Sequence, residues 1–313
     1  MSDEESKQSD SPHADALVTG ATGFLGSRLV AHLVSRGITV TCTTRSTSPP
    51  ASDGVRWRWC DLTKPTAVKD LFVETRPTVV FHLASHVSGL REPENVPVTF
   101  AGNLTAAVNV LLAALHVGSQ RVVLAGSYEE PEPGAAPRSP YAAAKAGATA
   151  YARMFSSLYG LSTVVLRPAM IYGPGQPDTS KLIPYVARCF LAGETPVLGS
   201  GRRPIDWVYV DDVVAAFAMA ATTPGVDGEV IDVGSGELHT IAEVVSVLRA
   251  LTGATEDAEF GGLRERSSEQ ILAADTRRAE QLLGWRATTS LEEGLTRTVE
   301  SIRAAPEAAA PSR

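Results

Sequence analysis

The sequence predicts an α/β fold: a doubly wound parallel sheet covered by helices on both faces, with a smaller C-terminal part interleaved with it. Three observations carry this prediction. Short apolar stretches suited to buried strands alternate with stretches of helical spacing, no internal repeat interrupts the alternation, and a glycine-rich loop joins the first strand to the first helix. Strands covered on both sides are apolar along their whole length, whereas strands of a one-sided sheet alternate apolar and polar residues.

The expected elements follow one another through the first half of the chain. A strand at residues 16–19 runs into the glycine loop, and the helix expected at residues 27–36 ends at Gly37. Further strands are expected at residues 38–44, 55–60, 78–83, 121–125 and 162–166, and further helices at residues 103–117 and 142–159. After about residue 173 the pattern loosens into proline- and glycine-rich stretches, with short helices expected at residues 182–192, 241–251 and 276–283.

Composition and charge narrow the function classes. Of the 313 residues, 44% are hydrophobic and 20% charged, as in ordinary globular proteins. The formal net charge of −7 argues against nucleic acid or an anionic membrane as the main partner, because both require a basic surface. Cys42, Cys60 and Cys189 have neither disulfide nor zinc-ligand spacing, and no metal site is expected. The acidic N-terminal stretch is unlike a signal peptide and no stretch approaches the ~18 apolar residues of a membrane span, so a cytoplasmic location is expected.

Gly20, Gly23 and Gly26 mark the turn between the first strand and the first helix. One such glycine permits a tight turn, one lets backbone N–H groups approach an anion, and one lets the helix pack closely on the strand. The helix N-terminus offers free N–H groups and the positive end of a helix dipole. The spacing is GxxGxxG rather than GxGxxG, but its place after the first strand predicts that the loop binds the pyrophosphate of a dinucleotide.

The end of the second expected strand indicates which dinucleotide is bound. Enzymes that use NAD normally carry an Asp or Glu there, which binds the ribose 2′-hydroxyl. Here residues 43–46 read Thr-Thr-Arg-Ser, so no carboxylate would repel a 2′-phosphate and Arg45 could pair with one. NADP(H) is therefore favoured over NAD(H), with Arg45 as a solvated loop residue as the alternative. Asp61, after the third strand, either binds the adenine amine or caps a helix.

A serine, a tyrosine and a lysine form the expected reacting centre. Ser127 follows the fifth strand, and Tyr141 and Lys145 lie four residues apart on one helical face. A free tyrosine has a pKa of about 10, and a neighbouring ammonium favours the phenolate, so the pair can exchange protons nearer neutral pH. A serine across the cleft can hydrogen-bond the same substrate oxygen. These groups can move the proton of an alcohol or a ketone while a nicotinamide exchanges a hydride with the same carbon.

These motifs divide the chain into a cofactor part and a substrate part. Residues 14–173 are expected to form an NAD(P)-binding domain of the Rossmann type, to which residues 206–234 return. Residues 174–205 and 235–303 are expected to form the substrate-binding domain. The polar residues 1–13 and the Ala- and Pro-rich residues 304–313 are expected to be disordered tails.

Motifs along nearly the whole chain are similar to those of one superfamily. They are Thr19-Gly-Ala-Thr-Gly-Phe-Leu-Gly26, His82-Leu-Ala84, Asn103, Ser139-Pro-Tyr-Ala-Ala-Ala-Lys145, Leu166-Arg-Pro168, Tyr172-Gly-Pro174, Asp206-Trp-Val-Tyr-Val-Asp-Asp212, Leu283-Gly-Trp285 and Ser290-Leu-Glu-Glu-Gly-Leu295. In them the sequence resembles the extended short-chain dehydrogenases/reductases, in the NAD-dependent epimerase/dehydratase group that modifies nucleotide sugars. The resemblance implies that Tyr141 is the acid/base, that Lys145 holds the nicotinamide ribose and that Ser127 binds the substrate oxygen.

The cofactor contacts and the oligomeric state are expected from the motifs and this resemblance together. The residues expected at the cofactor are Gly20, Thr22, Gly23, Phe24, Leu25, Gly26, Arg45, Asp61, Leu62, Leu83, Ala84, Ser85, Asn103, Tyr141, Lys145 and Pro168. Two long helices, one of them carrying the catalytic Tyr and Lys, are expected to form a homodimer.

The later motifs imply a nucleotide-linked sugar, bound at its diphosphate by arginines of the C-terminal part. Arg203, Arg264 and Arg266 are the candidates, with ordinary surface arginines as the alternative. One departure leaves room for a smaller carbonyl substrate. An Asn that often helps to hold the substrate before the Tyr-Gly-Pro motif is missing, and residues 169–171 read Ala-Met-Ile.

The residues after Ser127 leave several reactions open. Epimerases of the group usually carry small residues there, whereas Tyr128 and Glu129 follow in this chain. Glu129 resembles the glutamate with which 4,6-dehydratases remove the C5 proton of the sugar, although Tyr128 replaces the acid that precedes it there. Because Arg45 favours NADP(H), an NADPH-dependent reductase of a nucleotide-linked 4-keto-6-deoxy sugar is preferred. A C4 epimerase is the first alternative, a dehydratase using Glu129 the second, and a cofactor-sensing regulator without catalysis the last.

Overall fold

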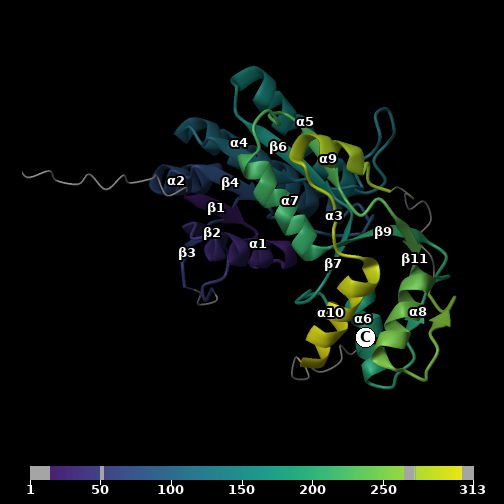
Figure 1. The fold of residues 1–313 in the computed structure, drawn as a ribbon. Helices are drawn as coiled ribbons and strands as arrows, with labels where there is room; N and C mark the ends of the chain where they lie inside the picture. Colours follow the sequence, from purple (N-terminus) through teal and green to yellow (C-terminus); the bar gives the residue numbers. More distant parts are fainter. Residues whose placement is uncertain (1–14, 50–52, 264–270, 272, 305–313) are drawn as a thin grey trace, which may run out of the picture.

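The structure is a computed structural model that describes residues 15–49, 53–263, 271 and 273–304 (Figure 1). The two expected tails, residues 1–13 and 304–313, lie outside the described residues except for Ala304, which ends the last helix.

Seven strands form the central sheet: β1 (Ala16–Thr19), β2 (Val40–Thr44), β3 (Val55–Trp59), β4 (Val79–His82), β5 (Arg121–Ala125), β6 (Thr163–Pro168) and β10 (Val230–Val233). Their order across the sheet is β10-β6-β5-β4-β1-β2-β3, and all neighbouring strands are parallel. The order reverses between β1 and β4, and ligands of open α/β sheets bind at such a reversal, beyond the carboxyl ends of the strands. The predicted Rossmann-type sheet is thereby confirmed.

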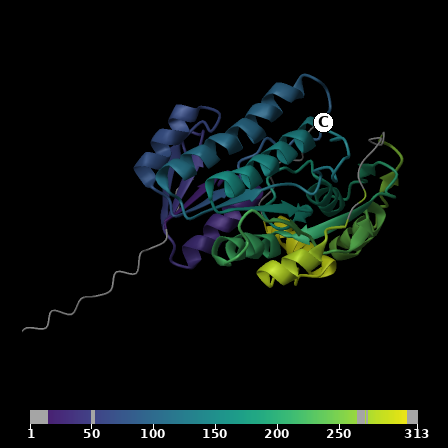
Figure 2. The same cartoon turned by 90° about the horizontal axis from the view of Figure 1, so that it is seen from above.

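Helices cover both faces of this sheet, as the two views in Figures 1 and 2 show. α1 (Phe24–Ser35) and α7 (Val210–Thr222) pack on one face. The helices of the other face are α2 (Pro65–Thr75), α4 (Ala106–Val117) and α5 (Pro140–Tyr159). All side chains of β1 are buried between the two layers, which explains why this strand is apolar without alternation.

One helical run is longer than the sequence predicts. α3 (Asn95–Thr99), the π-helical turn η1 (Phe100–Thr105) and α4 follow one another without a break, whereas the sequence predicts a helix from residue 103. By length and composition alone, the run Asn95–Val117 could cross a membrane, with a mean hydropathy of 1.7. This corrects the expectation that no stretch of the sequence is long and apolar enough to span a membrane. Half of the run is buried in the fold, because α4 packs against the sheet, α2 and α5.

The C-terminal part is built on a second sheet, whose strands are β7 (Met170–Tyr172), β9 (Pro204–Tyr209) and β11 (Leu238–Thr240). β7 and β9 are parallel, and β11 is antiparallel to β9. The other elements of this part are α6 (Leu182–Leu191), β8 (Val197–Leu198), α8 (Ile241–Thr252), β12 (Glu259–Phe260) and α10 (Leu291–Ala304). α9 (Thr276–Leu283), expected in the substrate-binding domain, instead packs on α7 and β10 of the main sheet, because its buried side chains join that core. Residues 206–209, expected to return to the main sheet, lie in this second sheet, while α7 and β10 do return. β9 lies in the second sheet because its hydrogen-bonded neighbours are β7 and β11.

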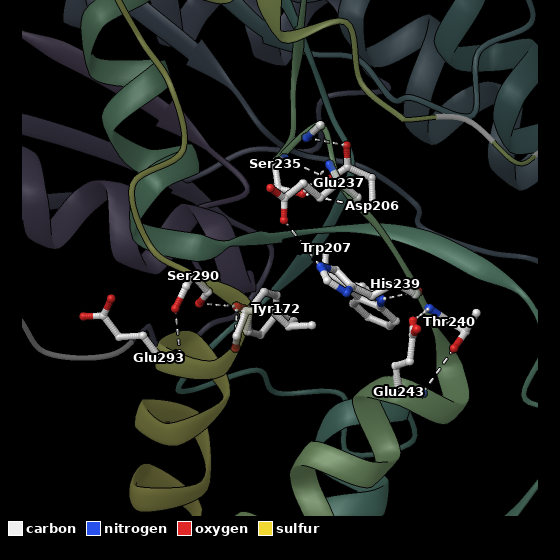
Figure 3. A network of polar contacts seen from close by, with 12 residues as sticks. Tyr172, Asp206, Trp207, Ser235, Glu237, His239, Thr240, Glu243, Ser290 and Glu293 are labelled. Carbon is white, nitrogen blue, oxygen red and sulfur yellow. Dashed lines mark hydrogen bonds and ion pairs between the residues drawn. The ribbon is translucent and has the colours of Figure 1, made fainter.

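A buried carboxylate joins the two sheets (Figure 3). Asp206 on β9 is fully buried and accepts hydrogen bonds from the N–H groups of Ser235, Gly236 and Ala274 and from the Ser235 hydroxyl, at distances between 2.8 and 3.1 Å. Ser235 and Gly236 follow β10 of the main sheet, and Ala274 precedes α9. One side chain of β9 therefore fixes two separate stretches of backbone.

Candidate active site

The glycine loop lies at the reversal of the strand order, with no room for side chains. Gly20 has φ +71°, and a Cβ on it would lie 2.6 Å from the backbone nitrogen of Ala84. A Cβ on Gly26 would lie 2.1 Å from the carbonyl oxygen of Gly20. Gly23 begins α1 without any side-chain cap, so the N–H groups of the first turn are left for an external acceptor. This backbone cradle fits a pyrophosphate.

The carboxyl ends of β1 and β4 are tied together beneath this loop. Thr19 Oγ1 lies 2.9 Å from His82 Nδ1 and accepts the N–H of Ala84 at 3.2 Å. Burial, together with the nearby charge of Lys145, lowers the pKa of His82 to about 3. His82 is therefore neutral and serves to hold the strand ends in register.

Asn103 holds the loop that follows β4. It is buried in η1, where its Oδ1 accepts the N–H of His86 at 2.7 Å and the hydroxyl of Ser85 at 2.9 Å. Its Nδ2 donates to the carbonyl oxygen of His86 at 3.1 Å. Three of its hydrogen-bonding positions are thus used within the chain, and its role here is to position Ser85.

The three predicted catalytic residues meet at the carboxyl end of β5. α5 begins where Ser139 accepts the N–H of Ala142 at 3.0 Å, and its first turns carry Tyr141 and Lys145. Lys145 Nζ lies 5.8 Å from the centroid of the Tyr141 ring and donates to the carbonyl oxygen of Ala125 at 2.8 Å. Ser127 is two residues beyond that carbonyl and is buried.

Burial dominates the electrostatics of this set. It raises the pKa of Tyr141 to about 12, while the hydroxyls of Ser127 and Ser85 act to lower that pKa and the charges of Glu129 and Glu130 act to raise it. Burial also lowers the pKa of Lys145 to about 8. In the protein alone, Tyr141 is therefore a neutral phenol at neutral pH. Lys145 is an ammonium at that pH and loses its proton at a pH about one unit higher.

Glu129 and Glu130 differ sharply in their surroundings. Glu129 is half-buried, and its N–H donates to Ser127 Oγ at 3.2 Å. Glu130 is only 4% exposed, and its carboxylate accepts the N–H of Ser127 at 2.8 Å. Sequence reasoning missed Glu130, because its burial comes from a tight turn and not from any periodic pattern. It also missed the pair of Arg167 and Asp232, 2.6 Å apart behind the site.

The residues expected at the adenosine end lie beyond β2 and β3. Arg45 is exposed, and its carbonyl oxygen accepts the indole N–H of Trp59 at 3.3 Å. Asp61 Oδ1 accepts the hydroxyl of Thr63 at 2.8 Å and its N–H at 3.0 Å, and these bonds, the hydroxyl first, hold the pKa of Asp61 below its usual value. Asp61 thus shapes the turn before α2, whose N-cap is Lys64.

The remaining predicted residues are scattered. Pro168 ends β6, and its carbonyl oxygen accepts the N–H of Tyr128 at 3.2 Å, beside the Ser127 turn. Arg203 precedes β9, and its carbonyl oxygen accepts the N–H of Ile241 at 3.1 Å. Arg264 and Arg266 lie outside the described residues.

Comparisons with known proteins agree with this geometry. A model described as the NAD dependent epimerase/dehydratase family matches residues 16–234. A UDP-glucose 4-epimerase of Mycolicibacterium smegmatis is 32% identical, over 92% of this chain and 98% of its own. A probable dTDP-glucose 4,6-dehydratase of Sinorhizobium fredii is 31% identical, over 91% of each chain. The structure of a Thermus thermophilus UDP-glucose 4-epimerase in complex with NAD has a TM-score of 0.82 at 30% identity, over 93% of this chain and 100% of its own.

Proposed function

Because the chain belongs to the NAD dependent epimerase/dehydratase family, and is an NAD(P)-dependent enzyme, we propose that it is a nucleotide-sugar 4-epimerase. The observation that carries the proposal is the cluster of Tyr141, Lys145 and Ser127 at the end of β5, next to the pyrophosphate cradle. The sequence alone favours a 4-keto reductase. The relatives named above are 4-epimerases and a 4,6-dehydratase, so they favour its first alternative.

The proposed reaction uses the chain's residues to move one proton twice. A nicotinamide cofactor bound on the glycine loop supplies the acceptor, and later the donor, of the hydride at C4 of the sugar. Tyr141 takes the proton of the C4 hydroxyl as the C4–H bond breaks, which leaves a ketone, and Ser127 donates a hydrogen bond to the same oxygen. After the sugar ring has turned over, Tyr141 returns the proton as C4 is reduced on its other face. Substrate and product are isomers, and no net oxidation occurs.

Positive charge beside Tyr141 makes the first of these proton transfers favourable. With a pKa of about 12, the phenol alone is too weak an acid to be ionised near neutral pH. The Lys145 ammonium, 5.8 Å from the centroid of the Tyr141 ring, favours the phenolate. The hydroxyl of Ser85 donates its one hydrogen to Asn103 Oδ1, so it would have to turn away from Asn103 to donate to the ionised oxygen.

Incubation of the purified protein with UDP-glucose, without added cofactor, tests the proposal. We expect the 4-epimer to form with no net change in nicotinamide absorbance, measured by chromatography of the nucleotide sugars. Net NADPH oxidation with a nucleotide-linked 4-keto-6-deoxy sugar, and no epimer from any nucleotide hexose, would instead establish the reductase.

A 4,6-dehydratase is the second candidate, favoured by one observation. Glu129 lies in the turn after Ser127, where its N–H donates to Ser127 Oγ, and its charge raises the pKa of the Tyr141 phenol. Incubation with dTDP-glucose distinguishes this candidate, because the product of a dehydratase is lighter by one water molecule. A Glu129→Gln variant that keeps full epimerase activity would leave Glu129 without a role in catalysis.

The cofactor preference is proposed to be NADP(H), on the strength of Arg45. No carboxylate lies at residues 43–46, and Arg45 is exposed at the end of β2. Replacing Arg45 with Gln should weaken NADPH binding about 10- to 100-fold and leave NADH binding within about twofold, because one charged phosphate contact is lost. Fluorescence titration measures both dissociation constants. Arg56→Gln, also exposed but near the start of β3, is the control, and equal losses for both cofactors in Arg45→Gln would contradict the assignment.

A homodimer through α4 and α5 is proposed from the surface of these helices. They pack side by side and expose large apolar side chains, among them Leu112 on α4 and Tyr151 and Leu158 on α5. We expect Leu112→Glu to convert the dimer into monomers in sedimentation velocity, because it places a charge in an apolar interface. Val73→Glu, at an exposed apolar position on α2, should leave the dimer intact. A monomeric parent protein would refute the proposal.

A further inference from the structure

We propose that Glu130 is a positioning residue of this site, whose buried carboxylate holds the Ser127 backbone in place and acts as the counter-charge of Lys145. The proposal rests on the proposed function, since it concerns the proton exchange at Tyr141. Its two parts, the hold on Ser127 and the buried charge near Lys145, rest on separate observations.

The hold on Ser127 is a closed pair of hydrogen bonds. Glu130 Oε1 accepts the N–H of Ser127 at 2.8 Å, and the N–H of Glu130 donates to the carbonyl oxygen of Ser127 at 3.1 Å. Both polar groups of the Ser127 backbone are thereby fixed by one residue. Gly126 makes the arrangement possible, because a Cβ at that position would lie 2.6 Å from Glu130 Oε1.

The charge of Glu130 lies among the groups that decide catalysis. It acts on Lys145 of α5, on Arg167 of β6 and on Tyr141, whose pKa the charge of Glu129 also raises. Arg167 is already paired with Asp232, 2.6 Å away. The hydrogen bond of Lys145 goes to an uncharged acceptor, the carbonyl of Ala125. Burial lowers the pKa of Lys145 to about 8, and the charge of Glu130 acts against that shift.

A carboxylate in this position is unfavourable for folding. Burial raises the pKa of Glu130, and the Ser127 N–H, the Thr149 hydroxyl, Arg167 and Lys145 offset that rise only in part. Glutamine has the same shape and can still accept the Ser127 N–H through its amide oxygen, but it carries no charge. Glu130→Gln therefore separates the charge from the hold on Ser127, and Glu130→Ala removes both.

The first test is the pH profile of turnover. Removing the negative charge lowers the pKa values of Tyr141 and Lys145, so in Glu130→Gln both limbs of the profile should move to lower pH by about 0.5 unit or more. We expect KM for the nucleotide sugar to stay within about twofold. In Glu130→Ala, kcat should fall about 10-fold further, because Ser127 is released. Glu132→Gln, which removes an exposed charge two residues away, should keep the parent profile.

The second test needs no substrate and separates this proposal from the proposed function. Because the folded-state pKa of Glu130 lies above its ordinary value of about 4.3, its carboxylate lowers stability as pH rises from that value through the folded-state pKa. Glu130→Gln should therefore melt about 2 °C or more above the parent protein at pH 7.5, and the difference should vanish toward pH 4.

Each outcome decides the proposal. Failure of the parent protein to turn over any nucleotide sugar would remove the proposed function, and the melting comparison would still show whether the buried charge opposes folding. An unshifted pH profile, or a lower melting temperature for Glu130→Gln at pH 7.5, would overturn the positioning role and leave Glu130 a structural residue.

Discussion

Replacing Tyr141 with Phe should lower turnover by about 10³-fold while leaving the fold and the bound cofactor unchanged, because general acid–base catalysis contributes on the order of 10² to 10⁴. The change removes only the hydroxyl, and the ring keeps its place 5.8 Å from Lys145 Nζ. Ser127 can still hydrogen-bond the substrate oxygen, but its hydroxyl is a far weaker acid than a phenol. The measurements are the rate of epimer formation and the cofactor content of the purified variant.

Tyr159→Phe is the matched control for this prediction. Tyr159 lies at the far end of the same helix, its side chain is exposed, and the same hydroxyl is removed without touching the site. We expect parent activity in that variant. A Tyr141→Phe protein with more than about a tenth of the parent turnover would show that another group handles the proton.

Replacing Asp206 with Ala should destabilise the protein by about 3–5 kcal/mol, the largest stability effect expected of any single change considered above. The variant leaves the donors of Ser235, Gly236 and Ala274 without their shared acceptor in a fully buried place. Chemical denaturation measures the loss. Because these donors belong to the junction of the two sheets, we also expect proteases to cleave the variant there before the main sheet unfolds.

Glu237→Ala is the control for Asp206→Ala. Glu237 lies near the same junction, but its side chain is exposed and its partner is His239 at 3.6 Å. Exposed ion pairs contribute roughly 0–1 kcal/mol, so this variant should melt close to the parent protein. A loss below about 1 kcal/mol in Asp206→Ala would mean that water replaces the carboxylate and that the junction is not tightly packed.

The main sheet could be predicted because its signals are local. β1 and β5 begin and end where the sequence predicts, since each is a short apolar run between turn residues. The second sheet could not be predicted in this way. β7 and β11 have only three residues each, and the pairing of both with β9 joins stretches far apart in the chain. Tertiary contacts, not local pattern, decide such strands.

The residues of the catalytic site also differ in whether the local sequence could identify them. Tyr141 and Lys145 could be identified because a spacing of four residues on a helix fixes their relation. Ser127 could be placed because it closely follows β5, the strand that precedes their helix α5 in the chain. Glu130 and Asn103 could not be assigned their roles, because both act on backbone groups of turns whose shape the sequence does not reveal. Whether a glutamate in such a turn points inward depends on room left by Gly126.

The π-helical turn at Phe100–Thr105 limits where a residue can be deleted from the chain. A π turn holds one residue more than an α turn, so deleting a single residue there would restore a regular helix at no cost in backbone hydrogen bonds. Each residue of an α-helix turns the chain by about 100°, so the deletion would also swing Asn103 away from His86 and Ser85. A chain shortened at this point would keep its fold, but Asn103 would no longer hold Ser85 and His86 in place. Insertions and deletions in sequences related to this one should therefore fall elsewhere, in loops that do not position a residue of the site.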